Sequence, residues 1–344
     1  MIDLRSDTAT RPTSEMRAAM AQAEVGDEQL REDPTVNELQ RRAAELLGQE
    51  EALFLPTATM ANQIALHVLG RPGGELIAEG RTHAMVFEAG GPAFHSGLVM
   101  RGLEGDRGRL SPAQLREAVR IADEFQPASV VVLENTHRSA GGRIWPLEDL
   151  EAVAATAREL GLAVHLDGAR LLNASVASGV AAADYGRLVD TVTLCFSKGL
   201  GCPLGAVLAG SRETMAKAWR GKFLFGGAMR QAGIVAAAAL YALDHNVERL
   251  SEDHARARRL AGGLAAAGLP VDPEAVDTNF VGIELAPLGL TEPQAKERIA
   301  REGVLVSVLR PGVLRAATYL GITDEDVERA VELIPKALGA LVRA

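Results

Sequence analysis

Two apolar runs in this chain each end in a single charged residue, and this pattern constrains the fold more than any other sequence feature. Residues 163–166 lead into Asp167, and residues 191–197 lead into Lys198. The stretch between them has helical spacing, so we expect the runs to be neighbouring strands of a parallel sheet. Ligands of such sheets bind beyond the carboxyl ends of the strands. Asp167 and Lys198 are therefore predicted to meet in a ligand site.

An acid and an amine in this position suit pyridoxal 5'-phosphate (PLP). The aldehyde of PLP requires a lysine to form a Schiff base, and its ring nitrogen requires an anionic partner that keeps it protonated. Gly199, Gly201 and Gly205 would let the backbone near Lys198 approach a flat ring. Taken alone, Lys198 is equally well a surface lysine in a turn, and Asp167 a helix N-cap. The apolar strand before Lys198 favours the functional interpretation.

Further candidates follow from single residues. Arg170 comes three positions after Asp167, and its guanidinium would fit a substrate carboxylate in bidentate fashion, although a surface arginine is an equal alternative. His83 would stack on a pyridine ring or handle a proton near neutral pH, but a lone histidine is more often structural. No local feature decides between these two roles for His83.

Two segments are candidates for a phosphate cradle. Residues 57–59 (Thr-Ala-Thr) lie between an expected strand and an expected helix, where backbone amides bind anions. Residues 225–231 form a glycine-rich loop that enters a helix, and Lys222 or Arg230 would reach a phosphate from there, even across a subunit boundary. Helix capping and a plain loop explain the two segments nearly as well.

Composition and motif searches exclude several classes of function. The net charge of −9 argues against a nucleic acid or an anionic membrane as partner, and no apolar run approaches the length of a membrane span. The sequence has no HExxH or CxxC metal motif, no GxGxxG and no GxSxG, so we expect no metal site. Cys195 and Cys202 flank the Lys198 loop, where a disulfide would distort it, which favours a reducing compartment such as the cytoplasm.

Alternating strand and helix patterns predict an α/β protein with a mostly parallel sheet. We expect an irregular N-terminal arm at residues 1–13, a large ligand-binding domain at 14–245 and a smaller C-terminal α+β domain at 246–344. Residues 230–268 are expected to be almost continuously helical, and one more strand is expected at 206–209.

With these residues assembled, the chain resembles the low-specificity L-threonine aldolases, PLP enzymes with the aspartate-aminotransferase type of fold (fold type I). The matching segments are DLRSDT at 3–8, EDPTVN at 32–37, TMANQ at 59–63, ENTH at 134–137, HLDGAR at 165–170, SKGLG at 197–201 and MRQAG at 229–233.

The resemblance implies retro-aldol cleavage of L-threonine, L-allo-threonine or related β-hydroxy-α-amino acids to glycine and an aldehyde. It implies that Lys198 forms the Schiff base, that Asp167 pairs with the ring nitrogen, and that His83 stacks on the ring. It also implies that the phosphate and the substrate carboxylate are held by two further groups of residues. These groups are Ala58, Thr59, Lys222 and Arg230 for the phosphate, and Ser6, Arg170 and Arg315 for the carboxylate. Family members are usually homotetramers, dimers of dimers with active sites at the dimer interface.

The sequence departs from the family pattern near the expected β-substituent. Residues 29–31 are Gln-Leu-Arg instead of Val-Tyr-Gly, a common histidine is replaced near Phe125, and Thr318-Tyr319 stands for Thr-His. Residues 57–59 are a milder variant of Ser-Gly-Thr. Threonine is thus not necessarily the preferred substrate. The alternatives are a PLP-dependent racemase or a β-eliminating lyase or synthase of the same fold, and a PLP-binding protein without enzymatic activity.

Overall fold

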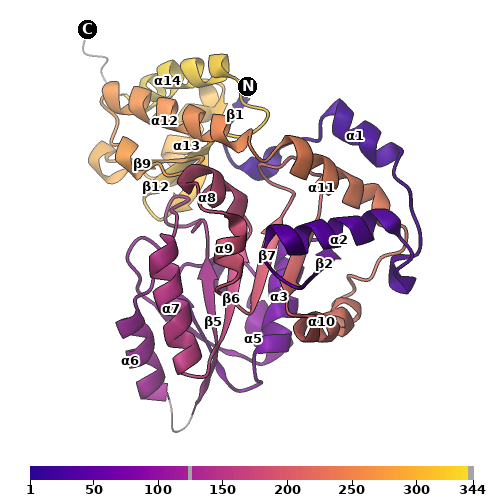
Figure 1. Ribbon diagram of the computed structural model, residues 1–344. Coiled ribbons are helices and arrows are strands. Elements are labelled where there is room, and N and C mark those ends of the chain that lie inside the picture. Colours follow the sequence, from indigo (N-terminus) through magenta and orange to yellow (C-terminus); the bar gives the residue numbers. More distant parts are fainter. Residues whose placement is uncertain (123–125, 340–344) are drawn as a thin grey trace.

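The computed structural model describes residues 1–122 and 126–339, and it places a small domain on top of a larger one (Figure 1). The large domain is built on a seven-stranded sheet. In spatial order its strands are β2 (Glu51–Leu55), β8 (Ala206–Gly210), β7 (Thr191–Cys195), β6 (Ala163–Gly168), β5 (Ala128–Glu134), β3 (Glu75–Glu79) and β4 (Val99–Leu103).

The strands that precede Asp167 and Lys198 are neighbours and run parallel, which confirms the central expectation from the sequence. Asp167 in β6 lies opposite Thr193 in β7. Two helices, α8 (Leu171–Ser178) and α9 (Ala182–Gly186), connect these strands where one was expected. Strand β8 runs antiparallel to both of its neighbours, so the sheet is mixed, and β4 is a strand that the sequence did not reveal.

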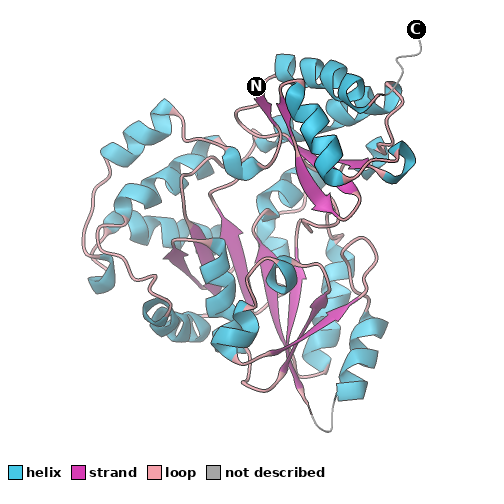
Figure 2. Ribbon diagram, turned by 180° about the vertical axis from the view of Figure 1, so that it is seen from behind, coloured by secondary structure: helices cyan, strands magenta, loops and turns pink. Residues whose placement is uncertain are grey.

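Helices cover both faces of this sheet (Figure 2), as a buried parallel sheet requires. One face carries α3 (Ala58–Leu69), α5 (Gly91–Ser96) and α10 (Arg212–Leu224). The other face carries α2 (Pro34–Leu46), α7 (Leu147–Glu159) and α9, with α6 (Pro112–Ala122), α11 (Gly233–His245) and α1 (Ser14–Ala21) packed outside them. A short helix, α4 (His83–Val86), follows β3. The segments that follow β5, β6 and β7 lie toward the small domain.

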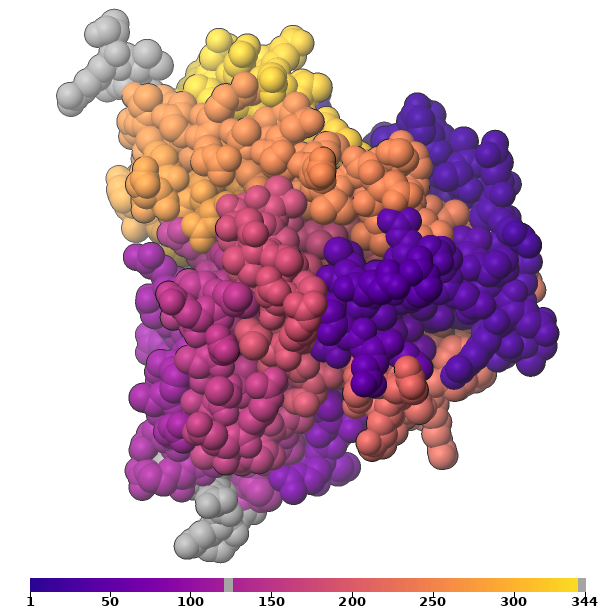
Figure 3. Space-filling view, viewed as in Figure 1, coloured from indigo at the N-terminus to yellow at the C-terminus, as the bar shows by residue number. Residues whose placement is uncertain are grey.

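Up to residue 339, the small domain combines three α-helices with two small sheets. Its elements are α12 (Leu250–Ala266), α13 (Glu292–Arg301), α14 (Asp324–Leu338), the antiparallel strands β11 (Ser307–Arg310), β12 (Val313–Ala317) and β9 (Phe280–Glu284), and the parallel pair β1 (Ile2–Asp3) and β10 (Val304–Leu305). The mostly parallel large domain with a small α+β domain is therefore confirmed. In Figure 3 the orange and yellow surface of the small domain lies directly against the large domain.

Two details differ from the sequence expectations. Residues 2–3 of the N-terminal arm are not irregular, because they form a strand, β1, at the small domain. Residues 230–268 are divided into α11, which packs on α1 and α2, and α12, which packs on α14 and β9. The chain changes neighbours at residues 246–249; the domain limits 1–13, 14–245 and 246–344 themselves remain a prediction. No helix in the described ranges is long and apolar enough to cross a membrane.

The arm is held to the small domain by apolar packing, and this predicts a stability effect. Leu4 is fully buried in the core of the small domain. We expect Leu4→Ala to lower the free energy of unfolding by about 2–5 kcal/mol, because it removes buried methyl groups and leaves a cavity. Urea unfolding followed by circular dichroism measures this. Leu30→Ala, at an exposed leucine, is the control, and equal stability of the two variants would contradict the packing described.

Candidate active site

Asp167 is a buried carboxylate at the carboxyl end of β6. Its Oδ1 accepts a hydrogen bond from the backbone N–H of Ala169 (3.0 Å), and its Oδ2 accepts one from Nδ2 of Asn62 (2.8 Å). Burial opposes ionisation, but the positive charges of His83 and Lys198 outweigh it and lower the pKa of Asp167. The fold thus brings Asp167, Lys198 and His83 into one electrostatic cluster and keeps Asp167 ionised.

The side chain of Asn62, from α3, is fixed by a neutral histidine. Oδ1 of Asn62 can only accept, so His165 Nε2, 3.0 Å away, carries the proton and donates to it. Nδ1 of His165 then accepts from the hydroxyl of Thr191 (2.8 Å). Burial lowers the pKa of His165 to about 4, which keeps the ring neutral. The Asn62 amide is thereby turned so that its NH₂ group faces Asp167 and Oε1 of Glu88 (2.8 Å).

His83 begins α4 and is held at both its backbone and its ring. Its backbone N–H donates to Oε2 of Glu134 (2.6 Å), and its Nδ1 lies 2.8 Å from Oε1 of Glu88. Burial opposes the charged form of His83, but Glu88, Asp167 and Glu134 outweigh burial and raise its pKa. Glu88 therefore orients the imidazole ring next to Asp167 and favours its charged form, while the ring centre of Phe87 lies 5.6 Å from that of His83.

Arg170 is engaged by a carboxylate from the N-terminal arm. Its Nε and Nη2 donate to the two oxygens of Asp7, each at 2.7 Å, and both residues are buried. Burial opposes ionisation of Asp7, but the Arg170 charge prevails and lowers its pKa. Asn279 of the small domain donates to the same carboxylate (3.3 Å), and the Arg170 guanidinium centre lies 4.8 Å from the ring centre of Phe280. Two of the three guanidinium nitrogens of Arg170 thus already have a hydrogen-bond partner.

Arg315, in β12, keeps part of its guanidinium free. Nε donates to Ser307 (3.1 Å), and Nη2 donates to the carbonyl of Arg5 (2.8 Å). Nη1 is buried and has no hydrogen-bond partner among the residues that the structure describes. Burial, together with the charge of Arg170, lowers the pKa of Arg315 to about 9. An anion at Nη1 would satisfy this group, as expected for a substrate carboxylate.

Ser6, the third residue predicted for the carboxylate, lies in the same arm and caps the 3₁₀ turn Asp7–Ala9. Its hydroxyl oxygen accepts hydrogen bonds from the backbone N–H (3.3 Å) and the hydroxyl (2.9 Å) of Thr8. It is a neighbour of Asp7 and hence of Arg170. Its contact with substrate remains a prediction.

The residues predicted for the phosphate are divided between two places. Ala58 and Thr59 lie in the first turn of α3. The side chain of the N-cap residue, Thr57, accepts a hydrogen bond from the backbone N–H of Met60 (3.1 Å). As at the start of any helix, the first backbone N–H groups lack partners within the helix. Lys222 is fully buried instead, with its ammonium bonded to Glu28 and to the carbonyl of Phe54 (2.6 Å).

Arg230 is exposed, and it pairs with Asp27 at 2.9 Å. Within one chain, Lys222 and Arg230 therefore have carboxylate partners of their own. Their contact with a phosphate remains a prediction.

These residues fit the chemistry of PLP. A lysine for the aldehyde and an imidazole both lie near the ionised carboxylate for the ring nitrogen, and helix amides lie in the segment expected for the phosphate. The buried Nη1 of Arg315 adds an orphaned donor for a substrate carboxylate. Atoms of His83, Glu88 and Asp167 also lie within 4.8 Å of one another, as metal ligands do. Their hydrogen bonds to one another and to Asn62 account for this arrangement.

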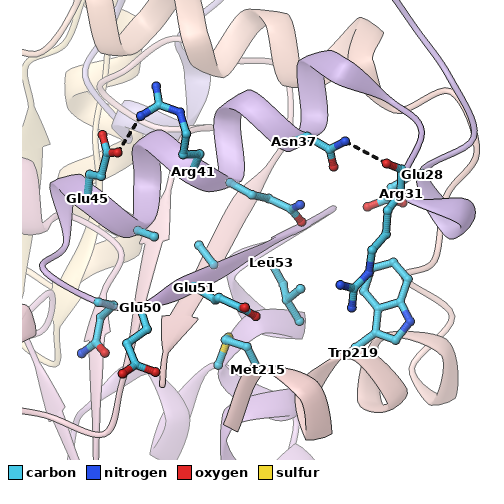
Figure 4. Close-up of a pocket in the computed structure, with 14 residues that line it drawn as sticks. Glu28, Arg31, Asn37, Arg41, Glu45, Glu50, Glu51, Leu53, Met215 and Trp219 are labelled. Carbon is cyan, nitrogen blue, oxygen red and sulfur yellow. Dashed lines mark hydrogen bonds and ion pairs between the residues drawn. The ribbon is translucent and has the colours of Figure 1, made fainter. Parts of the chain in front are cut away.

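A separate surface pocket of about 360 Å³ lies between α2, β2 and α10 (Figure 4). Its wall includes Arg31, whose guanidinium centre is 5.0 Å from the ring centre of Trp219, together with Arg41 and Glu45. Neither Lys198 nor Asp167 lines it, so we do not assign the chemistry to this pocket.

Residues that depart from the family pattern have identifiable structural roles. Arg31 adopts a left-handed conformation (φ 61°), which suits the glycine usual there, and Leu30 is exposed. The hydroxyl of Thr318 donates to the carbonyl of Asp253 (2.6 Å), and that of Tyr319 donates to the carbonyl of Asp3 (2.8 Å). Phe125 lies outside the described residues.

The sequence reasoning missed the contacts that four buried residues, Asp7, Asn62, Glu88 and His165, make with the predicted site residues or with one another. Three of them occur in the matching segments, but no spacing rule shows that they are bonded to Arg170, Asp167 and one another. Glu88 lies five residues after His83, which was a usable signal, since a short helix can place such a carboxylate beside the imidazole ring.

Comparisons with known proteins identify the family of this chain. The family model of the beta-eliminating lyases matches residues 3–286. A probable low-specificity L-threonine aldolase from Arabidopsis thaliana is 39% identical over 345 residues, covering 97% of this chain and 96% of that protein. An alanine racemase from Cochliobolus carbonum is 34% identical, covering 90% and 81%. A threonine aldolase structure from Leishmania major aligns over 98% of this chain and 100% of that one, with TM-score 0.85 and 20% identity.

The fold and the site define the class of PLP-dependent enzymes of fold type I. Within that class, this chain belongs to the beta-eliminating lyase family and to its low-specificity L-threonine aldolase branch.

The contact between Glu88 and His83 generates a testable titration. We expect Glu88→Gln to lower the pKa of His83 toward its usual value of about 6.5, because the variant removes the nearest negative charge from the imidazolium. NMR titration of histidine-labelled protein, with His83→Gln to assign the signal, measures this. Glu159→Gln on the exposed surface is the control. An unchanged pKa of His83 in Glu88→Gln would contradict the role of Glu88.

Proposed function

We propose that this protein is a PLP-dependent carbon–carbon lyase that cleaves β-hydroxy-α-amino acids, such as L-threonine or L-allo-threonine, to glycine and an aldehyde. The observation that carries the proposal is the buried network of Asp167, Asn62, Glu88 and His83 beside Lys198, with the free Nη1 of Arg315 nearby. When bound, PLP supplies an electron sink for the bond that breaks at Cα.

The residues of the chain supply binding, orientation and proton transfer. Arg315, supported by Arg170 and Ser6, binds the substrate carboxylate and thereby fixes the orientation of the Cα–Cβ bond. Lys198 provides the amine to which the cofactor is tethered, and the ionised Asp167 keeps the ring nitrogen protonated. His83, or a water held by it, takes the proton of the β-hydroxyl group. Its raised pKa favours the charged form, so the basic form gains as pH rises.

The tether and the reaction are tested together on the loaded enzyme. After borohydride reduction, mass spectrometry should find the cofactor on the wild-type peptide that contains Lys198. It should find no cofactor bound to Lys198→Ala. The control Lys217→Ala, at an exposed lysine on α10, should keep the cofactor on Lys198. L-threonine, L-allo-threonine and phenylserine should each yield glycine and an aldehyde. Racemisation of L-alanine without aldehyde release from any of these substrates would overturn the proposed reaction in favour of the racemase alternative.

We also propose that the enzyme is a homotetramer with active sites at a dimer interface. Large apolar side chains are exposed on neighbouring elements, among them Phe87 (44%) after α4, Phe94 (85%) on α5 and Leu224 (68%) at the end of α10. Helix α3 contacts both α5 and α10, and His95 on α5 lies 5.0 Å, centroid to centroid, from Phe225. Phe87 joins this patch to His83. A second copy of the chain would cover the patch and complete the wall of the site.

Disrupting this patch should change the size of the particle. We expect Phe94→Asp to give smaller particles in light scattering coupled to gel filtration, because it places a charge in a buried apolar interface. Ala113→Asp, on the exposed side of α6, is the control and should keep the wild-type mass. Unchanged mass of Phe94→Asp would show that this surface is not the interface.

The two free, buried cysteines support the proposed cytoplasmic location.

A further inference from the structure

Three arginines meet where the carboxyl ends of the strands face the small domain. Arg138 lies in the turn after β5, Arg170 precedes α8, and Arg315 lies in β12. The charges of Arg170 and Arg138 add to the effect of burial in lowering the pKa of Arg315. Asp7 compensates Arg170 through two hydrogen bonds. A single substrate carboxylate on Arg315 would leave Arg138 as a third cation without a ligand.

Arg138 is held in place but is not saturated. Its guanidinium centre lies 4.0 Å from the ring centre of Phe87, in a cation–π contact. Its Nη1 is buried and has no hydrogen-bond acceptor within residues 1–122 and 126–339. Glu134 is nearby, but its oxygens accept the backbone N–H groups of Arg138 (2.7 Å) and His83 (2.6 Å). The Arg138 side chain therefore presents a desolvated donor that an anion would satisfy.

The aromatic contacts pair Arg138 and Arg315 with different rings. Arg170 and Arg315 both lie over the ring of Phe280, at 4.8 and 4.6 Å from its centre. Arg138 instead lies over Phe87, whose ring is 5.6 Å from His83. In the proposed reaction His83 serves the β-hydroxyl group, so the side of the site near His83 receives the substituent on the β-carbon. Phe87 thus links Arg138 to the side of the site where His83 lies.

We infer that Arg138 is a specificity-determining residue that binds an acidic group on the β-carbon, so that the preferred substrates are β-hydroxy amino acids with a second carboxylate. This inference rests on the proposed function. The smallest such substrate is 3-hydroxyaspartate. Its Cα–Cβ bond breaks, the β-hydroxyl group loses its proton and becomes the aldehyde of glyoxylate, and Cα takes up a proton to give glycine. No oxidant or reductant is required.

The test compares an isosteric pair of ligands that lack the β-hydroxyl group and so cannot undergo the cleavage. Calorimetry on the PLP-loaded enzyme measures the dissociation constants of L-aspartate, L-asparagine and glycine. We expect wild type to bind aspartate at least about tenfold more tightly than asparagine, because a desolvated arginine gains a charge-assisted bond only with aspartate. Arg138→Met should abolish this ratio, and Arg138→Lys should restore part of it. Arg116→Met, at an exposed arginine of α6, is the charge-matched control and should keep the ratio.

Each outcome decides the inference separately from the proposed function. Equal affinities of wild type for aspartate and asparagine, or an unchanged ratio in Arg138→Met, would overturn the role of Arg138. So would an equal loss of glycine and aspartate affinity in Arg138→Met, since Arg138 would then bind the α-carboxylate. Melting temperatures verify that the variants are folded.

Turnover gives the independent readout. Suppose that threonine yields glycine and that wild type does not prefer 3-hydroxyaspartate, or keeps that preference in Arg138→Met. Either result overturns the inference and leaves the lyase function intact. Absence of aldehyde from every β-hydroxy amino acid overturns the lyase function, and the binding ratio still decides whether Arg138 recognises a second acid.

Discussion

The amide group of Asn62, shared between the carboxylates of Asp167 and Glu88, is the interaction on which the site depends. Two buried carboxylates repel each other and lose hydration, so both require donors in fixed positions. The neutral ring of His165 occupies the Asn62 oxygen, which leaves only the NH₂ group to face the two acids. With His83 bonded to Glu88, the site has an anion suited to a cationic ring and an oriented imidazole ring beside that anion.

The other half of the site is assembled between domains. The N-terminal arm adds a strand, β1, at the small domain and then carries Asp7 into contact with Arg170 of the large domain. The small domain contributes Arg315 and Phe280, and Phe280 contacts arginines from both domains. In the proposed function, binding of the substrate carboxylate would thus be coupled to the relative position of the two domains. In contrast, Asp167, Lys198 and His83 all belong to the large domain and keep their mutual arrangement within one sheet and its adjoining helix.

The sequence predicted those parts of the molecule that depend on local pattern. The strand that carries Asp167, the strand that leads to Lys198, their parallel pairing and the α/β class followed from apolar runs and helical spacing. The partner of Arg170 did not, because Asp7 is 163 residues away in the chain and its pairing depends on the path of the arm. Likewise, the antiparallel direction of β8 depends on the connection from β7, and no residue pattern in 206–209 records it. The ion pair of Lys222 with Glu28 is equally nonlocal.

The central claim is that the buried Asp167 remains ionised and keeps the cofactor ring nitrogen protonated. The most direct measurement is ¹⁵N NMR of the enzyme loaded with PLP that carries ¹⁵N in its ring, recorded from about pH 6 to about pH 9. The account predicts the chemical shift of a protonated pyridinium nitrogen throughout this range in wild type, and its loss in Asp167→Ala. A wild-type nitrogen that is unprotonated, or that loses its proton within this range, would contradict the account.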